Sequence, residues 1–396
     1  MSNGGMDPAG GLGMRRMNVG PQIEGRYVAR TVYDRRGRVL LRPGVYLTAN
    51  LLRLLGRHGV DRIWVTDRLL PRLEVGKAVR HETRVALTSA LLRIIKQVET
   101  GVSDGAIAEV RLKRAVTLLV DDILENDDVV SNVAHLRSVD SYSYAHSLQV
   151  AILSVIVGKA LALPYSRLHH LATGALLADI GKARIPKEIL DKPGPLTTEE
   201  RTVVEGHCRA GWDIVHQLLT IPPTASIVTL QHHERMDGSG YPGSLTGDQI
   251  YLFSRIVAVA DVFDALRAER PWRSSLAPSE VLHVFHDGMG RHFDAAVTSL
   301  LFDKVALVPD GEVVTLTDGT VGRVLAQRPG YPLQPLVVLV SGGDGTPLPE
   351  EVVDLSHDGR QVARIENDWP EEIQLRLQSP ESEGDLDKGG TQDPEG

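Results

Sequence analysis

Apolar and polar positions follow a helical spacing over most of the chain. Between residues 76 and 135, apolar residues recur every third or fourth position in "VALTSALLRIIKQVE" and "EVRLKRAVTLLVDDILEN". From about Asp140 to Phe302 the pattern stays mostly helical. This spacing predicts amphipathic helices. The helices before Asp140 could pair with each other or with a second chain.

The region before these helices has the pattern of a small mixed unit. Within residues 22–68, "RYVARTVYD" and "GRVLLRPG" indicate two strands joined by a turn around Arg36, and "VDRIWV" indicates a third. Between them, "LTANLLRLLGRHG" indicates a helix with Thr48 as its N-cap and Gly59 as its stop. We interpret this unit as a structural or docking module without chemistry.

The region after the helices changes to short strands. "EVVTLTDGTVGRVLAQ", "PLVVLVSGGDG" and "EEVVDLSHDGRQVARI" are separated by Asp-Gly and Gly-Gly turns, which are typical of hairpins. They predict a small β-barrel-like domain. The N-terminal "MSNGGMDPAGGLGMRRMNVG" has no apolar signal core and is expected to be a flexible leader.

These patterns define a multidomain α+β fold, since 396 residues are too many for one ordinary domain. The expected order is a small N-terminal α/β module, an all-α helical domain and a small C-terminal β-barrel-like module. The expected boundaries are 1–21 for the leader, 22–75 for the N-terminal module, 76–137 for a helical linker, 138–305 for the helical domain, 306–366 for the β domain and 367–396 for an acidic disordered tail.

Composition excludes several classes of protein. Between Asp368 and Gly396, nine acidic and two basic residues give that tail a charge of −7 out of the net −8. The remainder is nearly neutral, so charge offers no argument for nucleic-acid binding. No apolar run approaches a membrane span. The lone cysteine, Cys208, excludes an intramolecular disulfide and fits a reducing cytoplasm, where we expect the protein to act.

Histidines and aspartates of the helical region form the candidate chemistry. Each histidine alone is more often structural than functional, so the argument depends on their combination. An acid inside an apolar helix needs a partner, because burying an unpaired carboxylate is unfavourable. A pair of divalent cations, such as Fe, Mn, Co, Ni or Zn, would suit this set of donors and activate a hydroxide for attack on phosphorus. The residues are His146, Asp179, His207, His232, His233 and Asp261.

Two further features lie beside these residues. Lys182 follows Asp179 by three positions, where it could neutralise a phosphate oxygen. The loop "DGSGYPG" follows His232 and His233 directly. Its glycines would let backbone amides approach a ligand closely.

The stretch from Asp140 to about Phe302 resembles the HD-GYP family, a branch of the HD phosphohydrolases that hydrolyses cyclic di-GMP. The resemblance covers roughly 160 residues and rests on ordered motifs: "AHSLQVA", "LLADIGKARIP", "ILDKPGPLTTEE", "HCRAG", "HHERMDGSGYP" and "RIVAVADVFDALRAERPWR". The first unit and the 308–365 region also resemble modules that accompany this domain.

The resemblance implies a role for each matching residue. His146, His207, His232, His233 and Asp261 would ligate two divalent ions, most simply Fe or Mn, and Asp179 would bridge them. Lys182 would hold the scissile phosphate. The signature loop and three arginines would contact the nucleotide: Gly238, Gly240, Tyr241, Pro242, Arg255, Arg270 and Arg273.

Three positions depart from the family pattern. Ala178 stands where the family has the histidine of its HD pair, Gln149 where asparagine is usual, and Tyr142 where some members have a glutamate. Without that glutamate we expect no third metal, and the loss at Ala178 could leave only one ion. His170 lies eight residues before Ala178, about 12 Å along a helix, which is too far to replace the imidazole. Cys208 could supply a thiolate, although a helix-start role is the simpler interpretation; water could also fill the position.

Two functions of different classes therefore remain open. One is a metal-dependent phosphodiesterase that hydrolyses cyclic di-GMP in bacterial second-messenger signalling. The other is a degenerate receptor or interaction module that binds cyclic di-GMP, or a diguanylate cyclase (GGDEF) domain, without turnover. Hydrolysis of another phosphoester is a third interpretation. We expect no nucleic-acid or membrane partner, and a homodimer is plausible from the helices at 76–135.

Overall fold

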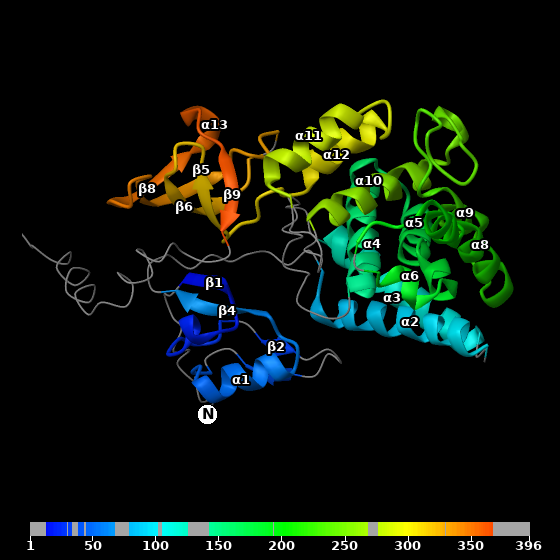
Figure 1. Ribbon diagram of the computed structural model, residues 1–396, viewed down its shortest axis with the longest axis horizontal. Helices are drawn as coiled ribbons and strands as arrows, with labels where there is room; N and C mark the ends of the chain where they lie inside the picture. Colours follow the sequence, from blue (N-terminus) through cyan, green and yellow to red (C-terminus); the bar gives the residue numbers. More distant parts are fainter. Residues whose placement is uncertain are drawn as a thin grey trace, which may run out of the picture.

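The computed structural model describes residues 13–29, 31–33, 39–42, 45–67, 79–101, 105–125, 142–192, 194–267, 276–328 and 330–366. In this part of the chain, separate hydrophobic cores belong to an N-terminal module, a large helical region and a C-terminal sheet (Figure 1). The expected turn around Arg36, the acidic tail, and Arg270 and Arg273 lie outside the described residues. The domain boundaries stay a prediction.

The N-terminal module has the expected helix and strands. Its helix α1 (Ala49–Arg57) begins after Thr48, whose side-chain hydroxyl accepts a hydrogen bond from the Leu51 backbone N–H at 3.4 Å. Strands β2 (Val32–Tyr33) and β3 (Val39–Leu41) pair with each other.

One further strand of this module was not expected. Strand β1 (Gly13–Asn18) pairs antiparallel with β4 (Arg62–Asp67) and brings Met17 into the core. The expectation of a flexible leader over 1–21 is therefore wrong for residues 13–18. The segment has no alternation of apolar and polar residues, so only its pairing with a strand far along the chain makes it β-structure.

The helical region begins with α2 (His81–Thr100) and α3 (Gly105–Glu125). These helices pack against each other, which was one of the two expected arrangements, the other being pairing with a second chain. Both helices contribute to the same core as the following helices, through buried residues such as Leu87 and Leu119. The other elements of this region are α4 (Tyr142–Ala160), α5 (Tyr165–Leu177), η3 (Ile180–Arg184), α6 (Lys187–Leu190), α7 (Thr198–Glu205), α8 (His207–Leu218), α9 (Pro223–Gln231), η4 (Gly247–Gln249), α10 (Leu252–Arg267), α11 (Pro278–Gly288) and α12 (Ala295–Lys304).

Helix α4 is the centre of this region and fixes the site. It contacts α5, α10 and α12, and its residues from Val150 to Val157 are buried on every face. A helix without a polar face is stable only when other helices surround it. Near the N-terminal end of α4, His146 lies beside Asp261 of α10 and near Asp179, which follows α5 (Figure 1 shows the three helices).

The C-terminal unit is one antiparallel sheet in the order β8-β7-β6-β5-β9. Its strands are β5 (Val313–Leu316), β6 (Val321–Ala326), β7 (Leu336–Ser341), β8 (Pro347–Asp354) and β9 (Val362–Glu366). The sheet is open in the described residues, with β8 and β9 as its edges, so the expected barrel-like closure is not found. The reason is that β9 returns to the free edge of β5, and β8 remains unpaired on its outer side.

A short helix, α13 (Leu355–Asp358), interrupts a segment expected to be strand. Asp354 caps it by accepting a hydrogen bond from the Ser356 backbone N–H at 3.1 Å, and Gly359 ends it with a φ of 87°. Across the described helices, none is long and apolar enough to cross a bilayer.

Candidate metal centre

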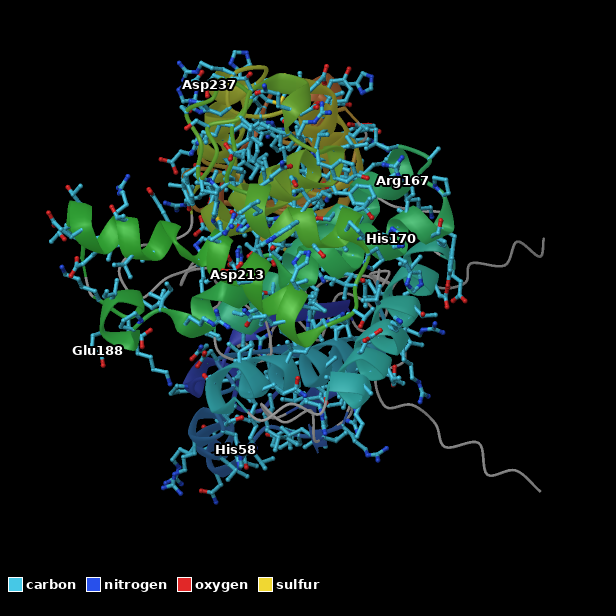
Figure 2. The ribbon with its side chains drawn as sticks, turned by 90° about the vertical axis from the view of Figure 1, so that its right-hand side faces the viewer. His58, Arg167, His170, Glu188, Asp213 and Asp237 are labelled. Atoms are coloured by element: carbon cyan, nitrogen blue, oxygen red, sulfur yellow. The ribbon has the colours of Figure 1, made fainter. Side chains whose placement is uncertain are left out.

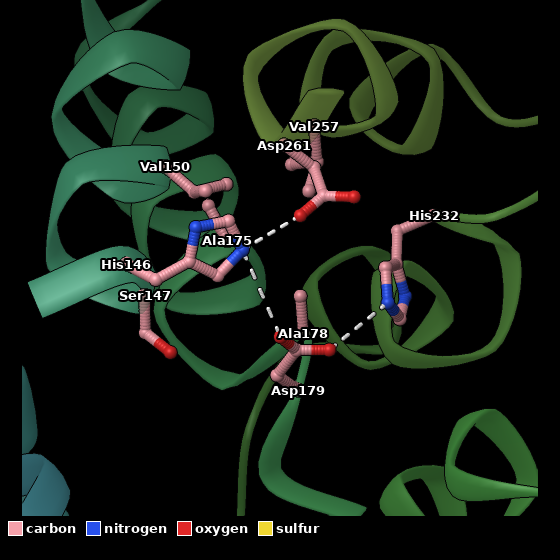
Figure 3. A pocket seen from close by; sticks show the side chains of 9 residues that line it. All are labelled: His146, Ser147, Val150, Ala175, Ala178, Asp179, His232, Val257 and Asp261. Atoms are coloured by element: carbon pink, nitrogen blue, oxygen red, sulfur yellow. Dashed lines mark hydrogen bonds and ion pairs between the residues drawn. The ribbon is translucent and has the colours of Figure 1, made fainter. Parts of the chain in front are cut away.

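The predicted donors come from five places along the chain and meet at one site within the helical region. His146 lies in the first turns of α4, Asp179 follows the end of α5, and His207 begins α8. His232 and His233 follow α9, and Asp261 lies within α10. Figure 3 shows Asp179 between His146 and His232, with Asp261 above His146.

The Asp179 carboxylate divides the donors into two groups. Its Oδ1 atom lies 3.4 Å from His207 Nε2 and 3.5 Å from His232 Nε2. Its Oδ2 atom lies 2.6 Å from Lys182 Nζ and 3.9 Å from His146 Nε2. One carboxylate thus faces two sets of nitrogen donors, as a bridging ligand would.

The two histidines around Oδ1 each use one ring nitrogen to donate a hydrogen bond to the backbone. The Nδ1 atoms of His207 and His232 lie 2.6 Å and 3.0 Å from the backbone carbonyls of Val204 and Val228, so each Nδ1 carries the hydrogen and donates it. In neutral rings, both Nε2 atoms are then acceptors, yet they lie only 3.3 Å apart. Asp179 Oδ1 is buried and forms no hydrogen bond with the described residues.

Three buried acceptors that face one point need a cation among them, since unpaired buried polar atoms are costly. Imidazole nitrogen and carboxylate oxygen are the donors that first-row divalent metals prefer. The residues present therefore fit a divalent metal ion at this position.

The second group is centred on His146. Its Nε2 atom lies 2.7 Å from Asp261 Oδ1, and its Nδ1 atom lies 2.7 Å from Asp264 Oδ2. His233 Nδ1 lies 3.8 Å from the other oxygen of Asp261. A ring whose Nδ1–H is held by a carboxylate is the usual arrangement of a metal-ligating histidine.

Asp264 was not among the site residues expected from the sequence. It lies one helical turn after Asp261, so both carboxylates reach the same face of α10. The pair of acids in "ADVFDAL", three positions apart in an apolar helix, was the available signal.

The electrostatics follow from this burial. Burial alone would lower the pKa of His146, but hydrogen bonds to Asp261 and Asp264 outweigh it and raise this pKa to about 10. Burial would raise the pKa of Asp179, but the charge of the neighbouring Lys182 outweighs it and holds this pKa well below its usual range. Burial and the neighbouring His232 lower the pKa of His233, which keeps its lone pair available to a metal.

The turn after Asp179 explains the glycine in "DIGK". A Cβ atom on Gly181 would lie 1.9 Å from the carbonyl oxygen of His207. The η3 turn and the start of α8 therefore approach each other at a distance that only glycine permits. This contact brings Asp179, Lys182 and His207 to the same place.

The signature loop lies over the same site. A Cβ atom on Gly240 would lie 2.4 Å from the backbone nitrogen of Arg235, so the loop folds directly onto the segment after His233. The Tyr241 ring lies 4.8 Å from the ring of His233 and 6.5 Å from that of His207, measured between centroids. Tyr241 and Pro242 are joined by a cis peptide bond.

Glu234 holds this loop and was also missed in the sequence. Its buried carboxylate accepts hydrogen bonds from the backbone N–H groups of Gly243 at 2.6 Å and Leu245 at 2.9 Å. Its position directly after His232 and His233 in "HHERMDGSGYP" was the only hint.

Ala178 borders the cavity at the centre. The cavity is lined by His146, Asp179, His232, Asp261 and Ala178, among others, and holds ≈ 10 Å³, about the room for one water. An imidazole at position 178 would therefore extend toward the donors. His170 is no substitute, because its Nδ1 atom lies 2.9 Å from the Thr224 hydroxyl, on the side of α5 that Figure 2 shows next to Arg167.

Arg255, which was expected to contact the nucleotide, forms contacts within the protein. Its guanidinium donates to Asp294 Oδ2 at 3.0 Å and to the backbone carbonyl of Ile250 at 3.0 Å. Asp294 also caps α12. Arg255 thus links α10 to α12.

The comparisons with known proteins agree with this geometry. Residues 128–297 match the family model described as HD domain. A cyclic di-GMP phosphodiesterase of Pseudomonas aeruginosa, PA4108, is 35% identical over 252 residues, which cover 62% of this chain and 60% of that protein. Residues 128–297 thus match an HD domain, and the chain is similar to proteins named cyclic di-GMP phosphodiesterases.

Other relatives of this chain have related names. The cyclic di-GMP phosphodiesterase response regulator RpfG of Xanthomonas campestris is 32% identical over 238 residues, covering 58% of this chain and 61% of that protein. The 3'3'-cGAMP-specific phosphodiesterase 3 of Vibrio cholerae is 28% identical over 295 residues, covering 64% and 63%. The chain thus spans somewhat under two thirds of the length of these curated relatives.

Proposed function

We propose that this protein is a metal-dependent phosphodiesterase that hydrolyses cyclic di-GMP. The observation that carries the proposal is the set of three buried acceptors, Asp179 Oδ1, His207 Nε2 and His232 Nε2, which lie 3.3–3.5 Å apart. Such a set of buried acceptors is unfavourable unless a cation lies among them. The named activities of the relatives supply the substrate class: cyclic dinucleotides, with cyclic di-GMP in two of the three.

The proposal gives the donors two metal positions. Asp179, His207 and His232 would hold one ion, and Asp179, His146, His233 and Asp261 the other, with Fe or Mn as the ions. When bound, such ions supply a Lewis acid and an activated hydroxide. Within the second group, Asp264 orients the His146 ring through Nδ1–H.

The remaining residues would bind the substrate. Lys182 is about one third exposed and lies 2.6 Å from Asp179, so its ammonium can turn to a phosphate oxygen beside the metals. The loop with Gly238, Gly240, Tyr241 and Pro242 would form the wall of the nucleotide pocket. Arg255 has a structural part in this proposal because Asp294 already pairs with it.

Ala178 favours a second candidate, a receptor without turnover. Its methyl group supplies no donor to a cavity that reaches Asp179 and His232. A protein of this kind would bind cyclic di-GMP, or a diguanylate cyclase (GGDEF) domain, and leave it intact. A homodimer could add to either function, since Val85 and Leu92 of α2 and Ile107 and Val110 of α3 are exposed.

Hydrolysis of cyclic di-GMP by the native protein and by Ala178→His, both loaded anaerobically with Fe(II) or Mn(II), separates the candidates. We expect turnover by the native protein at a rate within about tenfold of the variant. Turnover by the variant alone would make the natural protein a receptor. If neither protein hydrolyses cyclic di-GMP, its assignment as the substrate is refuted.

A further inference from the structure

Cys208 lies against the metal donors and has no part in the proposal above. It is the second residue of α8 and the only cysteine of the chain, and its side chain is fully buried. Its Sγ atom lies 3.6 Å from His207 Nε2. Donor atoms of Cys208, His207, His232 and His233 all lie within 4.8 Å of one another.

The spacing of these atoms fits a tetrahedral metal. Metal–nitrogen and metal–oxygen bonds of about 2.0–2.1 Å and a metal–sulfur bond of about 2.3 Å give tetrahedral edges of about 3.4 Å without sulfur and about 3.6 Å with it. An octahedral ion would give edges of only about 2.9–3.1 Å from the same bond lengths. The distances from His207 Nε2 are 3.3 Å to His232 Nε2, 3.4 Å to Asp179 Oδ1 and 3.6 Å to Cys208 Sγ.

The groups around Cys208 are metal donors. His207 and His232 each direct an Nε2 lone pair at the same point, and both rings are buried. Ala178 adds no donor to this point. With the two imidazole nitrogens and the carboxylate oxygen of Asp179, Cys208 Sγ brings the possible protein donors at this point to four.

We propose that Cys208 is a fourth protein ligand, as a thiolate, of the metal held by Asp179, His207 and His232. This inference rests on the proposed metal centre. On binding, the S–H bond breaks, a metal–sulfur bond forms and the proton leaves to solvent; a coordinating cation deprotonates a thiol outright. Because thiolate is a soft donor, it favours Fe(II), Co(II) or Zn(II) over Mn(II) at this position.

Co(II) is the probe that tests the thiolate directly. Titrated anaerobically into the metal-free full-length protein, it should give visible d–d bands from the bound ion and a near-ultraviolet band from sulfur-to-cobalt charge transfer. Since the chain has one cysteine, the second band can come only from Cys208. In Cys208→Ser and Cys208→Ala this band should vanish while the d–d bands remain, and Co(II) affinity should fall at least about tenfold in Cys208→Ala, the scale at which even outer-sphere losses begin.

The outcomes separate the two proposals. Visible bands without the near-ultraviolet band in the native protein would overturn the cysteine ligand and leave the metal centre standing. No Co(II) bands at all would overturn both. The native spectrum decides by itself if the variants do not fold. A matched Ser226→Ala change, buried on neighbouring α9 and outside the donor set, should leave both bands unchanged.

Discussion

Asp264→Asn removes the carboxylate that fixes the His146 ring. Asp264 Oδ2 accepts the Nδ1 hydrogen at 2.7 Å, and both side chains are buried, so no water can replace the lost contact at full strength. The asparagine is the same size but carries no charge. Its amide can also turn an N–H toward the ring, which would drive the ring to the wrong tautomer.

The magnitude follows from the role of such partners. Loss of a group that orients a ligating histidine costs roughly 10- to 100-fold in metal affinity. At 1.36 kcal/mol per tenfold, this corresponds to about 1.4–2.7 kcal/mol. We expect the upper half of this range because the pair is buried, where a charged hydrogen bond is stronger.

The assay is competition for Co(II) or Mn(II) between the protein and a fluorescent chelator at fixed pH. Asp213→Asn is the matched control, since Asp213 is only partly buried and its carboxylate lies 3.9 Å from Arg209 on α8. The control should keep its metal affinity within about twofold. Unchanged affinity in Asp264→Asn, alongside a large loss in Asp261→Asn, would refute the argument that Asp264 orients His146.

Three further predictions concern the surroundings of the donors. Glu234→Gln should weaken cyclic di-GMP binding about tenfold, as measured by calorimetry, and leave the metal content unchanged. The reason is that an amide can accept from only one of the two loop N–H groups. An equal loss of metal would contradict a role of Glu234 confined to the loop. Gly181→Ala should lower the free energy of unfolding by about 1–3 kcal/mol or more in urea titrations, since its Cβ would collide with the His207 carbonyl, whereas Gly56→Ala, which meets nothing within 4 Å, should not. In the metal-free protein, the raised pKa of His146 stabilises the fold fully below pH 6.5, and this contribution, at most about 5 kcal/mol, should be lost as pH rises toward 10; a flat urea-unfolding profile over that range would show that His146 is not held as a cation.

Local pattern was enough to place the main donors on their elements. His146 at the start of an apolar helix, Asp179 at the end of the next and Asp261 inside a third were all expected, and the helices are where the 3.6-residue spacing put them. The Thr48 cap and the strands after residue 308 were equally local signals. These features depend on neighbours within a few residues, so a single sequence contains them.

The features that were missed depend on distant parts of the chain. Asp264 meets a histidine 118 positions earlier, and Glu234 accepts from a loop that folds back on it. Strand β1 exists because β4 pairs with it. The open edge of the C-terminal sheet depends on which strand β9 pairs with. The pattern of residues within β9 does not indicate that partner.

The central claim is that Asp179 and its histidines hold metal for hydrolysis. The most direct test is a time course of cyclic di-GMP hydrolysis by protein loaded anaerobically with Fe(II), beside Asp179→Asn prepared in the same way and shown by circular dichroism to be folded. We predict product from the native protein and a loss of at least about 100-fold, with reduced bound iron, in the variant. Equal product from both, or intact cyclic di-GMP bound to iron-loaded native protein, would contradict the account.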